Sequence, residues 1–336
     1  MTDLDLDRLR PWLEVNIGLQ GPVEVEKIQG GQSNPTFLVR GVDRAVVLRR
    51  KPPGALLKSA HAVDREYRVQ AALSGSVVPV AGMLALCEDE GIVGSMFYVM
   101  EHVAGRTFDD PRLLDIEAAE RPLFINEMCR VLTAIHQVDL DTVGLSDYGP
   151  RGNYFRRQID RWSAQYKASA TGEIAAMDQL MTALDRACPE DDGRVTLVHG
   201  DYRIDNLMFA PDKPEVASVL DWELSTLGHP FADLAAVIMQ WQMPPGDQGR
   251  GLRGVDRAAH GLPSDEDFVA MYSDRMELNQ IDNFGFYVAF CFFRMAAILQ
   301  GVMKRAIDGN ASDPARGKKL GAFVPLYAEA GLEALG

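Results

Sequence analysis

The chain is poor in cysteine and in positive charge. Its four cysteines, Cys87, Cys129, Cys188 and Cys291, lie far apart and form no C-x-x-C pair. This spacing supports neither a disulfide framework nor a zinc site, so we expect a reducing compartment, the cytoplasm. Lysine and arginine total 34 against 48 aspartate and glutamate, which gives a formal net charge of −14. This balance argues against a nucleic-acid partner, because it does not offset phosphate repulsion.

The sequence also lacks a recognisable leader and a charge-free membrane span. The first ten residues, MTDLDLDRLR, are acidic and do not follow the basic-then-apolar order of a signal peptide. Residues 284–303 form an apolar run long enough to cross a bilayer, but Arg294 stands at its centre, where a charge is costly in lipid. We therefore expect a buried core helix and no membrane partner. The sequence predicts no particular oligomeric state.

Apolar periodicity divides the chain into a strand-rich part and a helical part. After an opening amphipathic helix, strands are predicted at 23–29, 35–40, 44–50, 84–88 and 95–100, with a helix at 60–73. Farther on, helices are predicted at 116–138, 153–168, 173–187 and 284–307, and short strands at 195–198, 207–209 and 216–220. The prediction is an α+β protein of two lobes. Residues 1–103 form a sheet plus a helix, and residues 104–336 are mainly helical.

The strongest functional signal is a pair of short apolar strands with polar residues at their ends. Leu197–Phe209 has the sequence LVHGDYRIDNLMF, and Val216–Glu223 has the sequence VASVLDWE. Phosphoryl transfer from ATP needs a carboxylate near the attacking hydroxyl and oxygen ligands for Mg²⁺. Asp201, Asn206 and Asp221 supply such groups. An ordinary β-turn is the alternative, since these residue types favour loops, but it does not explain why Asp221 also follows an apolar strand.

These motifs carry a family resemblance. H-G-D-x-x-x-x-N, followed by an apolar strand and D-x-[DE], resembles the aminoglycoside phosphotransferase and choline-kinase superfamily, relatives of the protein kinases. The continuation through Ser225–Ala235 is most similar to a subfamily whose kinase-like domain occurs alone in bacteria or is fused ahead of an acyl-CoA dehydrogenase in animals. The similarity runs from about Ile28 to beyond Leu234. It implies a protein-kinase-like two-lobed fold, with an antiparallel sheet in the first lobe, that uses ATP and Mg²⁺ to phosphorylate a small-molecule hydroxyl.

The resemblance implies a role for each matching residue around the catalytic loop. Asp201 matches the catalytic aspartate, and Asn206 and Asp221 match the magnesium ligands. Glu223 matches a second acidic position that touches magnesium directly or through water. Arg203 stands where protein kinases carry a lysine that reaches the transferred phosphate, with a surface arginine as the alternative. Two further matches are expected to brace the loop and to tie it to the next helix: His199 and Asp233.

The first lobe carries matching nucleotide-binding positions. A glycine turn, which a plain hairpin would also explain, offers backbone N–H groups to phosphates. This turn contains Gly30, Gly31, Ser33 and Asn34. Arg49 matches the third-strand cation that binds the α- and β-phosphates, with Arg50 or Lys51 as alternatives. Glu66 matches the helix glutamate that pairs with this cation, or else lies on a solvated helix face.

The stretch Phe97–Val103 (FYVMEHV) resembles the hinge between the lobes. The resemblance implies that its backbone at Glu101 and Val103 binds adenine. Met208, two residues after Asn206, matches the residue that forms the floor of the adenine pocket. Core packing is the alternative for this methionine.

Several substrates are compatible with the sequence. Protein substrates are disfavoured, because the H-R-D, D-F-G and A-P-E motifs of protein kinases are missing. The acceptor is expected near residues 153–166, where arginines interleave with aromatic residues: Tyr154, Phe155, Arg156, Arg157, Arg161 and Trp162. This segment is either an anion-binding patch, suited to a hydroxyacyl-CoA or a hydroxy acid, or an amphipathic helix with a solvated charged face. Aminoglycoside phosphotransferase activity and a non-catalytic nucleotide-binding or scaffolding module of acyl-CoA metabolism are the alternative functions.

Overall fold

The computed structural model describes residues 4–28, 34–52, 62–246, 249–310 and 313–336. Contacts within the chain define two units. The first, here called the sheet unit, comprises residues 1–108, 139–146 and 204–225, and the second, the helical unit, comprises residues 109–138, 147–203 and 226–336. An antiparallel sheet in the N-terminal region and helices in the C-terminal region confirm the predicted α+β class. The lobe boundary after residue 103 stays a prediction.

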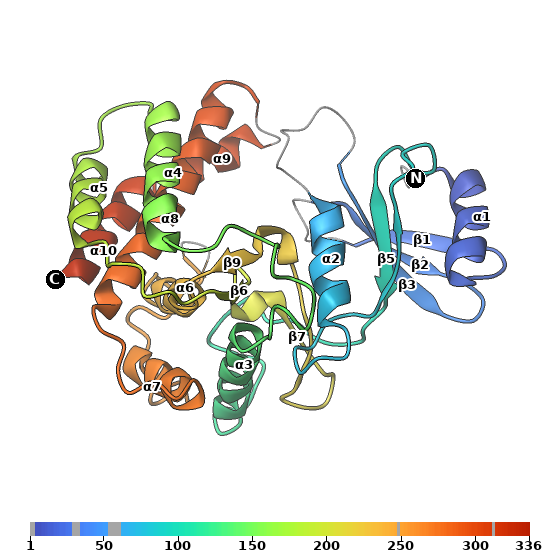
Figure 1. Ribbon diagram of the computed structural model, residues 1–336, viewed down its shortest axis with the longest axis horizontal. Helices are drawn as coiled ribbons and strands as arrows, with labels where there is room; N and C mark the ends of the chain where they lie inside the picture. Colours follow the sequence, from blue (N-terminus) through green and yellow to red (C-terminus); the bar gives the residue numbers. More distant parts are fainter. Residues whose placement is uncertain (1–3, 29–33, 53–61, 247–248, 311–312) are drawn as a thin grey trace. The chain divides into compact units, whose positions relative to one another are not determined.

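Five antiparallel strands in the order β1-β2-β3-β5-β4 form the scaffold of the sheet unit (Figure 1). They are β1 Glu24–Lys27, β2 Thr36–Arg40, β3 Ala45–Arg50, β4 Met83–Cys87 and β5 Phe97–Glu101. Successive side chains of a strand point to opposite faces of the sheet. Val46 and Leu48 of β3 therefore enter an apolar core on one face, while Arg49 points to the other.

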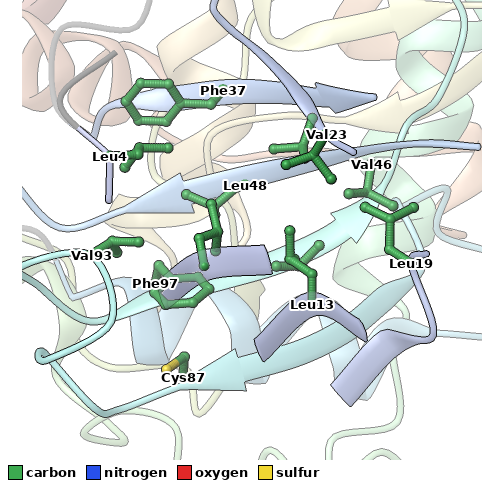
Figure 2. Close-up of a cluster of buried hydrophobic side chains, with 13 residues drawn as sticks. Leu4, Leu13, Leu19, Val23, Phe37, Val46, Leu48, Cys87, Val93 and Phe97 are labelled. Carbon is green, nitrogen blue, oxygen red and sulfur yellow. The ribbon is translucent and has the colours of Figure 1, made fainter. Parts of the chain in front are cut away.

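Helix α1 (Leu6–Ile17) covers the apolar face. The Asp5 side chain accepts hydrogen bonds from two backbone N–H groups of the first turn, and the left-handed Gly18 ends the helix. Leu13 is fully buried in a core that it shares with Leu48 of β3 and with residues of the neighbouring strands (Figure 2). This core fixes the register of β3, and with it the direction in which the polar residues of that strand point.

Helix α2 (Val63–Leu73) packs against β4 and β5, and its Glu66 meets the face of the sheet that carries Arg49. A hairpin of β7 (Leu207–Phe209) and β8 (Val216–Val219) belongs to the same unit. Short 3₁₀ turns precede and follow this hairpin, at Ile204–Asn206 and Trp222–Leu224. The hairpin therefore carries at its two ends the residues that were predicted to bind magnesium.

The helical unit is organised around one long helix. Its helices are α3 Arg121–His136, α4 Tyr154–Ala168, α5 Ala175–Ala187, α6 Phe231–Trp241, α7 Asp265–Arg275, α8 Phe284–Ile307, α9 Pro314–Gly321 and α10 Val324–Leu335. Strands β6 (Thr196–Val198) and β9 (Thr226–Gly228) pair antiparallel. Helices α4, α5, α6, α9 and α10 all contact α8 (Figure 1). The predicted helix at 116–138 begins only at Arg121, next to a proline in its first turn, where proline is favoured.

Helix α8 has the predicted bounds. It is long and apolar enough to span a bilayer, but 72% of its most apolar stretch is buried within the protein. The partners that bury it are helices of the same unit. It is therefore the core helix that the sequence predicts.

Candidate active site

A buried ion pair joins β3 to α2. Arg49 Nε lies 2.8 Å from Glu66 Oε2, and the side chain of Glu66 is only 1% exposed. Glu66 also accepts hydrogen bonds from the Tyr98 hydroxyl at 3.1 Å and from the side-chain amide of Asn34. Gln70, one turn later in α2, donates to the Tyr98 hydroxyl at 3.4 Å. Glu66 thus belongs to an interior hydrogen-bond network and not to a solvated helix face.

Strand alternation separates Arg49 from its neighbour. Arg50 points to the opposite face of the sheet, where its Nη1 donates to the Val93 carbonyl at 2.8 Å and its guanidinium lies over the Phe37 ring. Lys51 lies beyond the end of β3. Of the three cations that the sequence offers for the third strand, Arg49 is therefore the one that contacts the helix glutamate.

Two further carboxylates surround Arg49. Its Nη2 donates to Asp221 Oδ1 at 2.7 Å and lies 4.0 Å from Glu223 Oε2. Burial alone would lower the pKa of Arg49, but the carboxylates around it outweigh this and raise its pKa. Burial raises the pKa of Glu66 to about 7; the charge of Arg49 opposes this shift, and those of Asp221 and Glu223 add to it. Three acidic side chains thus lie around one guanidinium. Because the negative charge exceeds the positive charge here, a bound cation would be stabilised at this site.

The hairpin brings Asn206 close to the strand end that carries Asp221. Leu220 N donates to the Asn206 carbonyl at 2.8 Å, and Asp221 follows directly in a left-handed conformation, with φ 62°. Asn206, Asp221 and Glu223 offer amide and carboxylate oxygens, which are the donors that Mg²⁺ prefers. In the part of the chain that the structure describes, no three His, Cys, Asp or Glu side chains gather into a metal site. The oxygens of Asn206, Asp221 and Glu223 are of the kind that fits Mg²⁺, which usually takes one or two protein carboxylates and completes its shell with water and phosphate oxygens.

The hinge segment is bound to the hairpin strand that carries Met208. Arg106 and Phe209 exchange two backbone hydrogen bonds, of 2.8 and 2.9 Å. A Cβ on Gly105 would lie 2.4 Å from Met208 Cγ, so the glycine lets the chain pass close to this side chain. Glu101, at the end of β5, donates its N–H to the Gly82 carbonyl. Met208 thus lies against the segment that follows the hinge, and Glu101, Val103 and Met208 stay predicted nucleotide contacts.

Four residues of the glycine turn are predicted nucleotide contacts. Gly30, Gly31 and Ser33 lie outside the described residues. Asn34 is fully buried and donates to Glu66. Its amide therefore supports the ion pair, and its predicted contact with the nucleotide stays a prediction.

The loop of residues 199–203, which contains the predicted catalytic Asp201, follows β6 in the helical unit and is held by α6. Asp233 of α6 accepts hydrogen bonds from His199 N at 2.6 Å and from Gly200 N at 2.8 Å, and His136 Nε2 lies 3.4 Å from it. Burial alone would raise the pKa of Asp233, but its contacts with the two histidines lower it, so it is a carboxylate. His199 Nδ1 accepts a hydrogen bond from Asp201 N at 3.3 Å. Both bracing residues behave as the resemblance implies.

Asp201 and Arg203 follow in the same loop, and both side chains are partly exposed. Their side chains are 34% and 28% exposed, and Arg203 Nε is 3.9 Å from Asp201 Oδ1. The positive charge of Arg203 also acts on the partly buried Tyr327 of α10, where it opposes the rise in pKa that burial causes. Asp201 is therefore accessible to a substrate while a cation stands beside it.

Most of the arginine-rich segment turns out to be structural. Arg156 binds the side chain and the carbonyl of Asp185, and Arg157 binds the carbonyls of two residues just ahead of α4. Tyr154 and Phe155 are buried. Of the predicted patch, only Arg161 and Trp162 are left for a ligand, because the other side chains hold α4 in place.

Three residues near the site are not predicted by any sequence motif. Tyr98 and Gln70 contact Glu66 but have no motif of their own; the alternation of β5 was the usable signal, since Tyr98 faces away from the core residues beside it. As a charge in an apolar run, Arg294 disfavours a membrane span, but the run does not predict that its side chain donates to the Gly200 carbonyl. A charge inside a core helix was itself the signal for a polar contact.

Two cavities, of about 480 and 510 Å³, lie along α7 in the helical unit. They share Gln242, Asp265 and Glu266 and are lined by none of the predicted site residues. Their position does not bear on the chemistry of the catalytic loop, and the candidate active site is defined by the side-chain contacts described above.

Known proteins support the same assignment. The phosphotransferase enzyme family matches residues 24–272. Mouse acyl-CoA dehydrogenase family member 10 is 46% identical over 309 residues, which cover 91% of this chain and 29% of that protein. The chain thus spans less than a third of the length of this relative.

Solved structures extend the comparison. A proposed aminoglycoside phosphotransferase from Ralstonia eutropha JMP134 is 46% identical, with a TM-score of 0.90 over 99% of this chain and 98% of the other. The aminoglycoside phosphotransferase APH(4)-Ia, crystallised with ADP and hygromycin B, is 17% identical. Its TM-score is 0.64 over 97% of this chain and 98% of the other. At this identity the likeness shows the fold alone. The fold, the order of the motifs and these matches lead to one conclusion: the chain belongs to the phosphotransferase enzyme family.

Proposed function

We propose that this chain transfers the γ-phosphoryl group of ATP, with Mg²⁺, to a hydroxyl group of a small molecule. The observation that carries the proposal is the cluster in which Arg49 is shared by Glu66, Asp221 and Glu223. A cation at the sheet and carboxylates at a strand end are what a bound triphosphate and its metal require. A structural ion pair alone would need one carboxylate and not three.

The reaction assigns a separate task to each group. Asp201 accepts a hydrogen bond from the acceptor hydroxyl and receives its proton as the oxygen attacks the γ-phosphorus, while the bond from that phosphorus to the bridging oxygen of ADP breaks. Arg49 binds the phosphates that do not react, and Arg203 stabilises charge on the transferred group. Asn206, Asp221 and Glu223 would hold Mg²⁺, which would neutralise charge on the phosphates. Glu101 and Val103 bind adenine through their backbones, above Met208.

We further propose that the acceptor is a hydroxyacyl-CoA or a hydroxy acid. Two observations support this choice. The relative from mouse is named an acyl-CoA dehydrogenase family member. In addition, Arg161 and Trp162 form a cation–aromatic pair on α4, with the guanidinium 5.4 Å from the ring centroid. A cation beside an aromatic face suits an acceptor that is both anionic and partly planar.

Aminoglycoside phosphorylation is the second candidate. It is favoured by the 46% identity with the proposed aminoglycoside phosphotransferase from Ralstonia eutropha. Aminoglycosides are polycations, so this candidate requires acidic residues on the acceptor side. The cation–aromatic pair of Arg161 and Trp162 favours the anionic acceptor instead.

The test is a screen for ADP release with ATP and Mg²⁺ across hydroxyacyl-CoAs, hydroxy acids, aminoglycosides and amino alcohols. We expect turnover with an anionic hydroxy compound. Asp201→Asn should lower the rate about 10²–10⁴-fold, because the proton acceptor is lost, and should leave the Kd for ATP within a few-fold. Asp212→Asn, which changes an exposed carboxylate in the β7–β8 turn, is the matched control.

Three outcomes decide between the functions. Turnover of aminoglycosides but of no anionic acceptor would show that the acceptor is an aminoglycoside and not a hydroxyacyl-CoA or a hydroxy acid. Nucleotide binding with no turnover of any compound would favour a non-catalytic nucleotide-binding module. An Asp201→Asn variant with undiminished turnover would remove the assigned base.

A further inference from the structure

The peptide groups of Gly200 are held from two sides. Gly200 N donates to Asp233 Oδ1 of α6 at 2.8 Å, and the Gly200 carbonyl accepts from Arg294 Nη2 of α8 at 2.8 Å. Gly200 has φ 84°, a left-handed conformation that side chains rarely adopt. Because glycine has no side chain, its backbone has a wider range of accessible conformations than that of other residues. The two hydrogen bonds therefore fix the backbone immediately before Asp201.

Arg294 is an unusual residue for its position. It is partly buried near the middle of α8, among apolar side chains that belong to the core of the helical unit. No carboxylate among the described residues pairs with it, and its polar contact is the Gly200 carbonyl. A partly buried charge is costly and persists only where its contacts compensate for the lost hydration. The contact with Gly200 is thus the physical reason for an arginine at this point of α8.

Trp162 of α4 holds the guanidinium of Arg294 from another direction. The carbon at the centre of the guanidinium lies 5.9 Å from the centroid of the indole ring, and Trp162 Nε1 donates to Gln158 Oε1 at 3.1 Å, one turn earlier in α4. The indole is therefore fixed on its own helix. Its ring makes a favourable cation–aromatic contact with the guanidinium of Arg294.

The charges of Arg294 and Asp233 complement each other across the loop. Burial raises the pKa of the Cys291 thiol; the positive charge of Arg294 opposes this shift and the negative charge of Asp233 adds to it. Both charges therefore act on the same region of the helical unit. They are arranged with the anion toward the N–H and the cation toward the carbonyl of Gly200, the favourable orientation for the peptide dipoles.

We infer that Arg294 is a positioning residue for the phosphoryl transfer: by holding the Gly200 carbonyl, it orients Asp201 toward the acceptor. This inference rests on the proposed function of Asp201. Rotation of the Gly200–Asp201 peptide would swing the Asp201 carboxylate, and a displacement of about 1 Å at a reacting group can cost on the order of 100-fold in rate. Arg294 acts through Gly200 and contacts neither nucleotide nor acceptor.

The experiment compares three variants with the parent protein. Arg294→Met removes the donors and keeps an apolar chain of similar length in α8. Arg294→Lys retains the positive charge and an ammonium group that can still donate a hydrogen bond. Lys304→Met is the matched control, because it removes another cation of α8 whose partner is Asp308 on the surface. For each variant, kcat and KM with the acceptor found in the screen are measured, together with the Kd for ATP, the melting temperature, and hydrogen exchange of peptides that cover residues 196–206.

If Arg294 positions the loop, Arg294→Met lowers kcat about 10- to 100-fold, with both KM values within threefold of the parent. Exchange in the 196–206 peptides becomes about tenfold faster, because local opening of the loop is no longer opposed. Arg294→Lys recovers part of kcat, and Lys304→Met matches the parent.

Two results overturn the inference: a kcat of Arg294→Met within threefold of the parent, or unchanged exchange in these peptides. If Arg294→Met does not fold, Arg294→Leu, which also removes the donors, carries the test, and activity and exchange like those of the parent in that variant overturn the inference. Hydrogen exchange needs no acceptor. A parent protein that phosphorylates no compound therefore refutes the proposed function alone, while exchange still decides whether Arg294 holds the loop.

Discussion

Single residues set the electrostatics of the sheet unit, and Glu66 is the central one. Its carboxylate meets Arg49, Asn34 and Tyr98 in the interior. The family resemblance implies the pair with Arg49, because a third-strand cation and a glutamate of the next helix match the family pattern. It does not predict the Asn34 and Tyr98 contacts, because these depend on which face of the sheet each side chain occupies in three dimensions.

The raised pKa of Glu66 predicts how stability depends on pH. Its pKa is about 7 in the folded protein against an ordinary value of 4.5. Between these two values the folded state binds more protons than the unfolded state, so this stabilising contribution is complete below pH 4.5 and is lost as the pH rises through 7. The unfolding free energy of the parent should fall by about 3 kcal/mol relative to Glu66→Gln, which does not titrate, between pH 4.5 and 8.

The measurement is urea unfolding of the parent and of Glu66→Gln at half-unit steps of pH. The difference between the two free energies isolates the titration of this one group. Parallel curves across the whole range would show that Glu66 keeps an ordinary pKa in the folded protein.

At the scale of elements, the contact between the hinge segment and β7 depends on a glycine. A Cβ at Gly105 would lie 2.5 Å from the Phe209 carbonyl oxygen as well as close to the Met208 side chain. Because a backbone oxygen cannot move aside as a flexible side chain can, the exchange of hydrogen bonds between Arg106 and Phe209 would be strained.

Gly105→Ala should therefore lower the unfolding free energy by roughly 1–3 kcal/mol, the usual cost of overpacking. It should also weaken ATP binding, because Met208 and the hinge backbone would shift. Denaturant titration and calorimetry measure the two effects. Gly172→Ala is the control, since its added Cβ meets nothing within 4 Å, and equal stability of the two variants would contradict the prediction.

Elements also show where sequence patterns succeed. The bounds of α8 are predicted because its apolar run is long and unbroken, and β3 and β5 are predicted from short apolar runs between breakers. The start of α3 is predicted too early, because the apolar pattern continues into the turns before Arg121. The bracing of the loop follows from the resemblance, whereas the approach of α8 to Gly200 requires packing between segments about 94 residues apart, which no local pattern encodes.

At the scale of the whole molecule, ligand binding should raise the free energy of unfolding. A ligand that binds only the folded state raises the unfolding free energy by about 2.7 kcal/mol at a concentration of 100 times its Kd. We expect this increase with ATP and Mg²⁺ together, and a smaller one with ATP and a chelator, because the carboxylates around Arg49 then repel the phosphates.

Asp221→Ala should abolish the difference that Mg²⁺ makes, since it removes one carboxylate of the proposed metal site. Thermal melting with ATP, with and without Mg²⁺, provides the measurement, and Asp212→Asn is again the control. A variant that keeps the full Mg²⁺-dependent increase would exclude Asp221 as a ligand.

The backbone at Asp221 has a consequence for laboratory evolution. A non-glycine residue in the left-handed region costs roughly 1 kcal/mol or more, and Asp221 adopts φ 62° at the end of β8. A library selected for heat tolerance alone would therefore be expected to enrich glycine at this position, whereas a library selected for turnover would retain aspartate. Opposite outcomes of the two selections at a single codon would reveal the conformational penalty that the protein tolerates there.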